Sequence, residues 1–134
     1  AIPSTNLNRI REVQAHGVTV AITQYGASDS AVHTLSSLPV SILKVDEAII
    51  SSMPTDETSR LMAKACLDLG YDLGLDVYAA GVDHAPTARI VREMGFDGMQ
   101  GLALAGSMIR ESMTRWLLSP RPHSTLPAAN PSRD

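Results

Sequence analysis

The sequence predicts an α/β fold built on a parallel sheet. Three short apolar runs rich in β-branched residues, at residues 18–22, 40–45 and 75–80, have the composition of strands buried on both faces of such a sheet. Helix-period segments alternate with these runs, and the strand starts lie roughly 20 to 35 residues apart, which is typical of repeated βα units joined by right-handed crossovers. A closed eight-stranded barrel needs about 250 residues, so a chain of 134 residues has room for about half of one.

Apolar residues at helical spacing predict the first two helices. Residues 6–16 repeat apolar side chains at every third position and stop at Gly17, which can take the left-handed conformation of a helix C-cap. Residues 56–73 form a second amphipathic helix, which Gly70 and Gly74 weaken or end. The apolar stripe expected on this helix consists of Leu61, Met62, Ala65, Cys66, Leu69 and Leu73.

Two further helices and a weaker strand complete the predicted domain. Pro86 lies near the start of a helix, where its missing N–H costs nothing, and Gly95 closes that helix. A weaker strand is expected over residues 98–104 and a last helix over residues 107–118. The inner face expected for the last helix consists of Ile109, Met113, Trp116 and Leu117.

The composition bounds the domain and excludes several classes of function. The expected domain is residues 1–118, and residues 119–134 are expected to be a disordered tail because they hold four prolines and little apolar content. The net charge of −3, with no basic block, gives little support to nucleic-acid binding or to a polybasic membrane anchor. A lone cysteine, Cys66, excludes an intrachain disulfide and fits a reducing, cytoplasmic setting. No apolar run reaches the roughly 18 residues of a membrane span.

Polar side chains follow the ends of the predicted strands, where the working residues of parallel βα folds collect at one rim. The residues expected at this rim are Thr23, Gln24, Lys44, Asp46, Gln100 and the stretch 80–83. Lys44 and Asp46 lie two positions apart on one strand, so an ammonium and a carboxylate could pair there. The sequence leaves two interpretations open: a lysine that holds a phosphate or a nucleophilic water beside an orienting acid, or an ion pair that ends a buried strand.

The predicted rim contains few residues that could bind a catalytic metal ion. Cleavage of phosphate diesters by divalent cations needs several converging carboxylate oxygens. The rim offers only Asp46, Asp83 and Asp97, while Thr23 and Gln24 bring no negative charge. None of the four histidines pairs with another at metal-ligand spacing on a helix face, and no Walker-type phosphate loop is present.

Three stretches of the chain carry the motifs of one bacterial family. Residues 17–46, GVTVAITQYGASDSAVHTLSSLPVSILKVD, are similar to its strand, Asp-Asp-Phe-Gly loop, short helix, Leu-Pro-Val and Leu-Lys-Ile-Asp. Residues 73–83, LGLDVYAAGVD, are similar to its Leu-Gly-Leu, strand and Ala-Glu-Gly-Val-Glu, and residues 94–101, MGFDGMQG, to its Leu-Gly-Cys-Asp and Gln-Gly element. Over roughly residues 7–118 the chain thus resembles the C-terminal half of the EAL-type cyclic di-GMP phosphodiesterase domain. The resemblance implies the C-terminal half of a TIM-type barrel and, in active members, hydrolysis that depends on Mg²⁺ or Mn²⁺.

The departures from this family fall on the residues that carry its chemistry. Thr23 and Gln24 stand where the family has paired metal-binding aspartates, and Ala80 stands where it has a glutamate. Asp83 occupies the position of a second glutamate and is one methylene shorter. The resemblance implies vestigial catalytic positions at Lys44 and Asp46, ligand-binding positions at Lys44, Asp83 and Gln100, and neither a metal site nor a cofactor. It also implies that the Glu-Ala-Leu segment would lie before residue 1.

We therefore expect a degenerate EAL-type domain that acts in cyclic di-GMP signalling as a regulatory or protein-interaction module. The alternative is an active phosphodiesterase whose remaining site residues come from sequence before residue 1 or from a partner chain. Weak binding of cyclic di-GMP through Lys44 and Gln100, without metal, is a third hypothesis. Because an open parallel sheet leaves unpaired N–H and C=O groups at its edges, we expect a protein partner or self-association, most simply as a homodimer.

Overall fold

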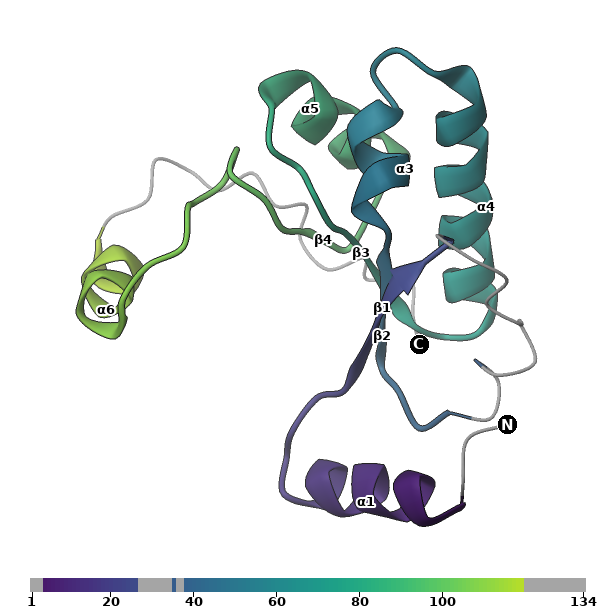
Figure 1. Ribbon diagram of the computed structural model, residues 1–134, viewed down its shortest axis with the longest axis vertical. Helices are drawn as coiled ribbons and strands as arrows, with labels where there is room; N and C mark the ends of the chain where they lie inside the picture. The colour runs from purple at the N-terminus through teal and green to yellow at the C-terminus, as the bar shows by residue number, and fades with distance from the viewer. Residues whose placement is uncertain (1–3, 27–34, 36–37, 120–134) are drawn as a thin grey trace.

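The computed structural model describes residues 4–26, 35 and 38–119 as a parallel α/β structure. Its helices are α1 (Ser4–Ala15), α3 (Glu47–Ser52), α4 (Glu57–Asp72), α5 (Ala85–Met94) and α6 (Arg110–Leu118). Its strands are β1 (Ala21–Tyr25), β2 (Ile42–Val45), β3 (Asp76–Ala79) and β4 (Gly98–Met99). They form one sheet in the order β1-β2-β3-β4, with every neighbouring pair parallel (Figure 1). The predicted fold class is confirmed. The expected tail lies almost entirely outside the described residues and stays a prediction.

The predicted and observed strands differ most at the two edges of the sheet. The sequence predicts the first strand at residues 18–22, whereas β1 is Ala21–Tyr25 and its pairing with β2 starts with the N–H of Ser41 donating to the carbonyl of Val20 at 3.0 Å. The last strand is much shorter than the predicted 98–104. After Met99 the chain turns, and the N–H of Leu104 donates to the carbonyl of Gly101 at 3.1 Å.

Helix α3 is absent from the sequence prediction and begins directly where β2 ends. Asp46 is its N-cap, and its Oδ1 accepts a hydrogen bond from the backbone N–H of Ala48 at 2.9 Å. The buried side chains of Ile49 and Ile50 hold this short helix against the core. Sequence reasoning missed it because six residues show too little periodicity, and because Asp46 was interpreted only as a rim residue.

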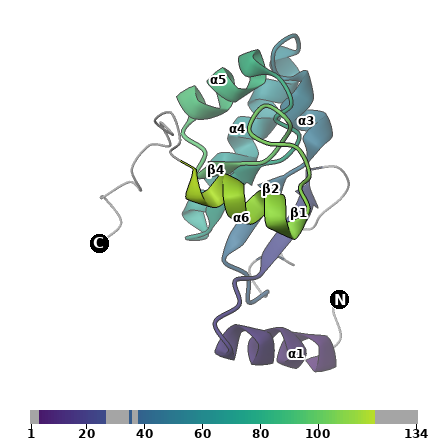
Figure 2. The ribbon, with the colours of Figure 1, turned by 90° about the vertical axis from the view of Figure 1, so that its left-hand side faces the viewer.

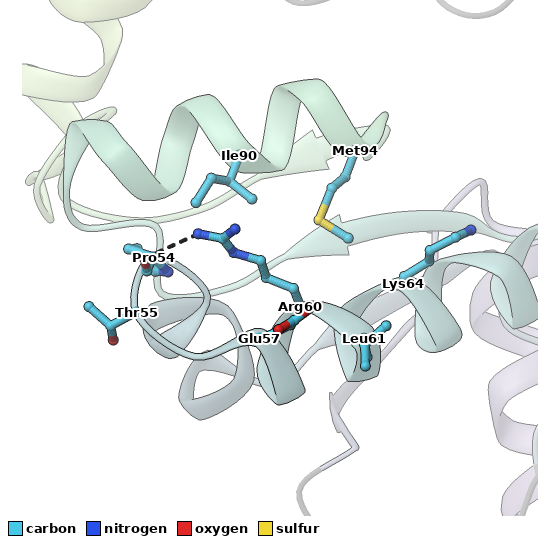
Figure 3. Close-up of a pocket in the computed structure, with 8 residues that line it drawn as sticks. All are labelled: Pro54, Thr55, Glu57, Arg60, Leu61, Lys64, Ile90 and Met94. Carbon is cyan, nitrogen blue, oxygen red and sulfur yellow. Dashed lines mark hydrogen bonds between the residues drawn. The ribbon is translucent and has the colours of Figure 1, made fainter.

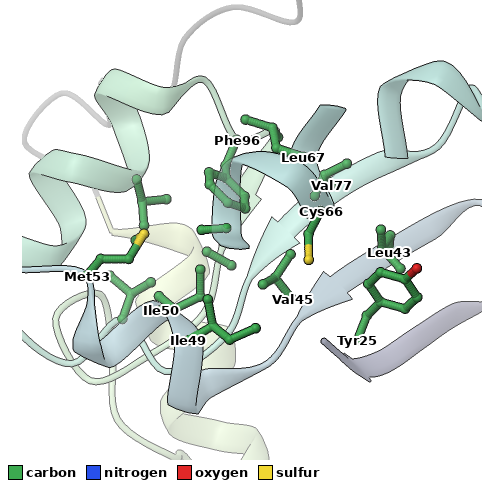
Figure 4. Close-up of a cluster of buried hydrophobic side chains, with 14 of the residues drawn as sticks. Tyr25, Leu43, Val45, Ile49, Ile50, Met53, Cys66, Leu67, Val77 and Phe96 are labelled. Carbon is green, nitrogen blue, oxygen red and sulfur yellow. The ribbon is translucent and has the colours of Figure 1, made fainter. Parts of the chain in front are cut away.

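One face of the sheet is covered by helices and the other is not. Leu43, Val45, Val77 and Ala79 are completely buried and alternate along their strands with side chains that keep some exposure. Helices α3, α4 and α5 lie together on the buried side (Figures 1 and 2). Side chains from α3 and α4 meet those of the strands there, with Phe96 closing the cluster (Figure 4). The open face carries Ile42, Lys44, Asp76 and Tyr78, none of which is buried.

Helix α4 buries a different stripe from the one expected. Of the six predicted residues only Cys66 is buried, while Leu69 is half-buried and the side chains of Leu61 and Met62 are 64% and 43% exposed. The buried residues of α4 are Ser59, Ala63, Cys66, Leu67 and Gly70. Three of these five are small, which lets the helix axis come close to the strands and turns the larger side chains outward.

The inner face expected for the last helix is also wrong. No residue of α6 is buried, and Ile109, Met113, Trp116 and Leu117 are between 38% and 70% exposed. Figure 1 shows α6 standing apart from the helices that cover the sheet. Its apolar period is real, but this face is only partly covered. Among these residues no helix has the length and apolarity needed to cross a membrane.

Replacing Gly70 tests the close approach of α4 to the sheet. Helix propensity alone would favour Gly70→Ala by about 1 kcal/mol. The new Cβ, however, would lie 2.3 Å from Cγ2 of Val77 and 3.3 Å from Cδ2 of Leu43, and such overpacking costs about 1–3 kcal/mol. We therefore expect a net loss of roughly 1 kcal/mol in the free energy of unfolding, measured by urea denaturation. In the double variant with Val77→Ala the loss should be smaller than the sum of the single losses, and strict additivity would contradict the contact.

Candidate functional site

The carboxyl ends of β2, β3 and β4 meet at one rim, as the sequence predicts for a parallel sheet. The closest link across this rim joins Lys44 on β2 to Gln100, which follows β4. The Nζ of Lys44 donates to Oε1 of Gln100 at 2.6 Å, although the two residues are 56 positions apart in sequence. The structure therefore brings together two of the residues expected to bind a ligand.

Asp46 does not pair with Lys44, so the ion-pair interpretation of these two residues is wrong. Its carboxylate caps α3, as described above, and its side chain is only 7% exposed. The chain leaves the strand after Val45, which directs the carboxylate to the N-terminus of α3, where a negative charge is favoured by the helix dipole.

The segments that follow β3 and β4 are joined by hydrogen bonds along the rim. The N–H of Val82 donates to the carbonyl of Gln100 at 2.9 Å, and Oδ1 of Asp83 accepts from the N–H of Leu102 at 2.9 Å. A Cβ at Gly101 would lie 2.2 Å from the carbonyl oxygen of Val82, so this approach requires glycine. The carboxylate of Asp83 thus holds the turn after β4 in place.

Thr23 and Gln24 lie at a bulge in β1. Ile22 pairs with Leu43 and Tyr25 with Val45, so two residues of β1 stand opposite Lys44 alone. Gln24 has a φ of 58°, the left-handed region, where it is the one non-glycine residue within the described ranges. Both side chains are exposed. The sequence predicts these residues just after the strand, whereas they belong to it, and no composition signal marks the bulge.

The donors at this rim make a poor set for divalent cations. The side chain of Ala80 is a methyl group, and the neutral oxygens of Thr23 and Gln24 are weaker ligands than carboxylates. Asp46 and Asp83 each use one carboxylate oxygen in a backbone hydrogen bond. Within residues 4–26, 35 and 38–119, no three side chains of His, Cys, Asp or Glu are placed to hold a metal ion.

Cys66 and Tyr25 lie in the core below the rim and stay protonated at neutral pH. Burial raises the pKa of the Cys66 thiol. Burial, followed by the nearby Cys66, raises the pKa of the Tyr25 phenol. Both side chains belong to the buried apolar cluster (Figure 4), so Cys66 packs in the core as the sequence predicts.

A separate groove of about 550 Å³ lies between α4 and α5, on the helical side of the sheet (Figure 3). Arg60 crosses it, with Nε donating to the carbonyl of Met53 at 2.6 Å and Nη2 to that of Pro54 at 3.1 Å. None of the residues expected at the functional site lines this groove. The guanidinium is engaged by backbone carbonyls and secures the loop between α3 and α4.

Comparison with known proteins decides the family. The model of the EAL domain matches residues 2–107. The chain belongs to the EAL domain family. An uncharacterized protein of Mycobacterium tuberculosis strain H37Rv is 30% identical to it over 127 residues, which are 94% of this chain and 20% of that protein.

Two solved structures place the sheet within the EAL fold. The EAL domain of Mycobacterium smegmatis DcpA matches with a TM-score of 0.79 and 25% identity, covering 87% of this chain and 53% of that chain. The PaMucR phosphodiesterase, solved in complex with cyclic di-GMP, matches with a TM-score of 0.74 and 28% identity, covering 81% of this chain and 44% of that chain. The EAL domain described here therefore belongs to a family of cyclic di-GMP signalling, and its sheet corresponds to about half of the TIM-type barrel of these neighbours. The predicted resemblance is confirmed.

Substitution of Asp46 separates its role as a cap from any role of its charge. Asp46→Ala removes the acceptor for the N–H of Ala48, and we expect a loss of about 1 kcal/mol in the free energy of unfolding. Asp46→Asn keeps an acceptor oxygen and should retain most of that stability. Urea denaturation measures both variants. If Asp46→Asn lowers the free energy of unfolding as much as Asp46→Ala does, the negative charge of Asp46, and not its hydrogen bond to Ala48, stabilises the start of α3.

Proposed function

We propose that this EAL domain has lost hydrolytic activity and acts in cyclic di-GMP signalling, in the cytoplasm, as a regulatory module that binds protein. The observation that carries the proposal is the donor set at the rim. Three positions at which the family resemblance implies metal ligands hold Thr23, Gln24 and Ala80. Of the three carboxylates expected at the rim, Asp46 and Asp83 support a helix and a turn. The expectation for Asp97 is wrong: it lies at the amino end of β4, where its Oδ2 accepts from the N–H of Val77 at 2.7 Å.

The physical consequence concerns activation of the attacking water. Divalent cations with few anionic ligands keep most of their own water and bind weakly. Without bound cations, the water has no Lewis acid to lower its pKa, and several kcal/mol of transition-state stabilisation are lost. The residues at this rim therefore do not fit the metal pair that active members use.

The hydrogen bond between Lys44 and Gln100 limits the affinity of this rim for a nucleotide. An ammonium and an amide can recognise a phosphate and a base edge. Here the two side chains already satisfy each other at 2.6 Å, so a ligand must replace that hydrogen bond before it gains a new one. We propose weak binding of cyclic di-GMP at most, with Asp83 acting indirectly by holding the turn after β4.

The absence of hydrolysis is tested directly. The full chain, incubated with cyclic di-GMP and Mg²⁺ or Mn²⁺, should form no linear pGpG above a control without protein, because the rim does not hold the cations that activate water. Chromatography of the nucleotides measures the product, with the PaMucR phosphodiesterase as a positive control for the assay. Production of pGpG that scales with the concentration of this chain would overturn the proposal.

The competing hypothesis, an enzyme completed by other sequence, draws support from Lys44, Asp46 and Gln100, which match the family in kind. Restoring the acidic positions with Thr23→Asp, Gln24→Asp and Ala80→Glu tests it, in the longest natural protein that contains this chain. We expect the parent protein to be inactive and the triple variant to gain pGpG formation, because restored carboxylates supply the missing ligands. The matched control carries Thr23→Asn, Gln24→Asn and Ala80→Gln, which restore size without charge. Activity in the parent protein would favour the enzyme, and a folded but inactive triple variant would show that the deficit lies outside these three positions.

A further inference from the structure

The hydrogen bond between Lys44 and Gln100 crosses a strand to which neither residue belongs. Lys44 lies on β2 and Gln100 follows β4, and β3 lies between these two strands in the sheet. Neighbouring strands are about 4.8 Å apart, so the two backbones are roughly 10 Å apart. Both side chains therefore extend over β3 to bring Nζ and Oε1 within 2.6 Å of each other.

Ala80 is the residue of β3 at the level of this hydrogen bond. The ladder continues past the end of β3, with the N–H of Ala80 donating to the carbonyl of Val45 at 3.3 Å and that of Gln100 to the carbonyl of Ala79 at 2.9 Å. Ala79 is completely buried on the helical side, so alternation along the strand turns Ala80 to the face that carries Lys44. The methyl group of Ala80 leaves space above β3, whereas a larger side chain would stand in the path of the lysine.

Tyr78 occupies the same face of β3 one level lower. It is the register partner of Lys44, and a Cβ at Gly98 would lie 2.8 Å from the Cε2 and Cζ atoms of its ring. The ring therefore leans over β4, away from Lys44. The level of Ala80 is left as the route by which Lys44 reaches Gln100.

The backbone that carries Gln100 is held from two sides. Its N–H donates to Ala79, as described above, and its carbonyl accepts from the N–H of Val82 at 2.9 Å. Only the side-chain torsions of Gln100 remain to be ordered when it accepts from Lys44, and this favours the closed arrangement. Because the side chain makes neither backbone bond, it can be replaced without loss of this clasp.

The acceptor of Lys44 is a neutral amide, although carboxylates lie at the same rim. Asp46 and Asp83 are engaged by backbone N–H groups. Of the two lysines in the chain, only Lys64 forms an ion pair within the described ranges, with Asp68 at 2.8 Å. A hydrogen bond between two charged partners is stronger than one to a neutral amide, so an anionic oxygen can displace Gln100 from Lys44.

We propose that the hydrogen bond between Lys44 and Gln100 is an autoinhibitory latch across the rim, which Ala80 permits and which a phosphate group of a nucleotide has to open. Gln100 then competes with the ligand for Lys44, the opposite of the ligand-binding role expected from the sequence. The inference rests on the proposed weak binding of cyclic di-GMP and supplies its physical cause.

Acetylation of lysine tests the latch directly, because Lys44 and Lys64 are the two lysines of the chain and report on each other. The full chain is treated with N-hydroxysuccinimide acetate and its peptides are analysed by mass spectrometry. We expect Gln100→Ala to raise the rate of acetylation at Lys44 about three- to tenfold, because the ammonium loses its partner, and to leave the rate at Lys64 unchanged. The matched control, Asp68→Ala, should raise the rate at Lys64 about twofold and leave Lys44 unchanged. Equal rates at Lys44 in the wild type and Gln100→Ala would overturn the latch.

Substitutions at Ala80 test whether its size permits the hydrogen bond. Ala80→Leu should raise acetylation of Lys44 to the rate found in Gln100→Ala, while Ala80→Ser, which adds little volume, should keep the rate of the wild type. Circular dichroism establishes that each variant is folded, and Ala80→Val, with the same expected direction, replaces Ala80→Leu if that variant unfolds. A folded variant with a larger side chain and an unchanged rate at Lys44 would contradict the role given to Ala80.

Binding of cyclic di-GMP in the presence of EDTA tests the competition with ligand, and equilibrium dialysis measures it. We expect Gln100→Ala to bind several-fold more tightly than the wild type, and Lys44→Ala added to it to abolish the gain. Gln14→Ala, which removes an amide from α1, should leave the affinity unchanged. Weaker binding by Gln100→Ala, or none at high micromolar nucleotide, would overturn the competition. Neither measurement involves hydrolysis, so formation of pGpG by this chain would refute the proposed function and leave the acetylation result standing.

Discussion

The close packing of α4 against β2 and β3 is the contact on which the rest of this structure depends. It is made by small residues: a Cβ on Gly70 would lie 2.3 Å from Cγ2 of Val77, too close for any side chain, and Ala63 is completely buried. Because the helix sits so near the strands, the core is narrow and is filled by short aliphatic side chains such as Val45 and Val77. That packing holds together the two central strands whose carboxyl ends carry the rim.

The acidic residues at the rim have a structural role that the fold itself requires. Asp46 ends a strand and starts a helix, and Asp83 secures the turn that follows β4. Each carboxylate is matched to backbone N–H groups, which is a stable arrangement for a negative charge at a strand end. Lys44 lies two positions before Asp46, and its ammonium donates a hydrogen bond to the side-chain amide oxygen of Gln100. Each of these three charged groups therefore has a hydrogen-bond partner within the protein.

The sequence predicted the class of fold and the gathering of polar residues because both follow from period and topology. Short apolar, β-branched runs and helices of period 3.6 establish a parallel βα order, and that order alone brings Lys44 near Gln100. The expectation that these strands are buried on both faces is wrong for β2 and β3, because helices cover one face and leave Lys44 and Tyr78 partly exposed on the other. Prediction from the sequence failed where burial depends on which elements lie next to each other in space. The buried stripe of α4 follows from how close the helix lies to the strands, and α3 forms because Asp46 caps it and Ile50 is buried. The exposed α6 was misjudged since an apolar face indicates only that something should cover it.

The bulge at Thr23 and Gln24 has a backbone conformation that restricts which residues fit there. Gln24 occupies a left-handed conformation, which aspartate and asparagine tolerate better than glutamine does, because their short side chains can hydrogen-bond locally. An aspartate at this position would adopt that geometry with less strain. The bulge in β1 is therefore a place where the backbone is compatible with an acidic residue, and Gln24→Asp should relieve strain there.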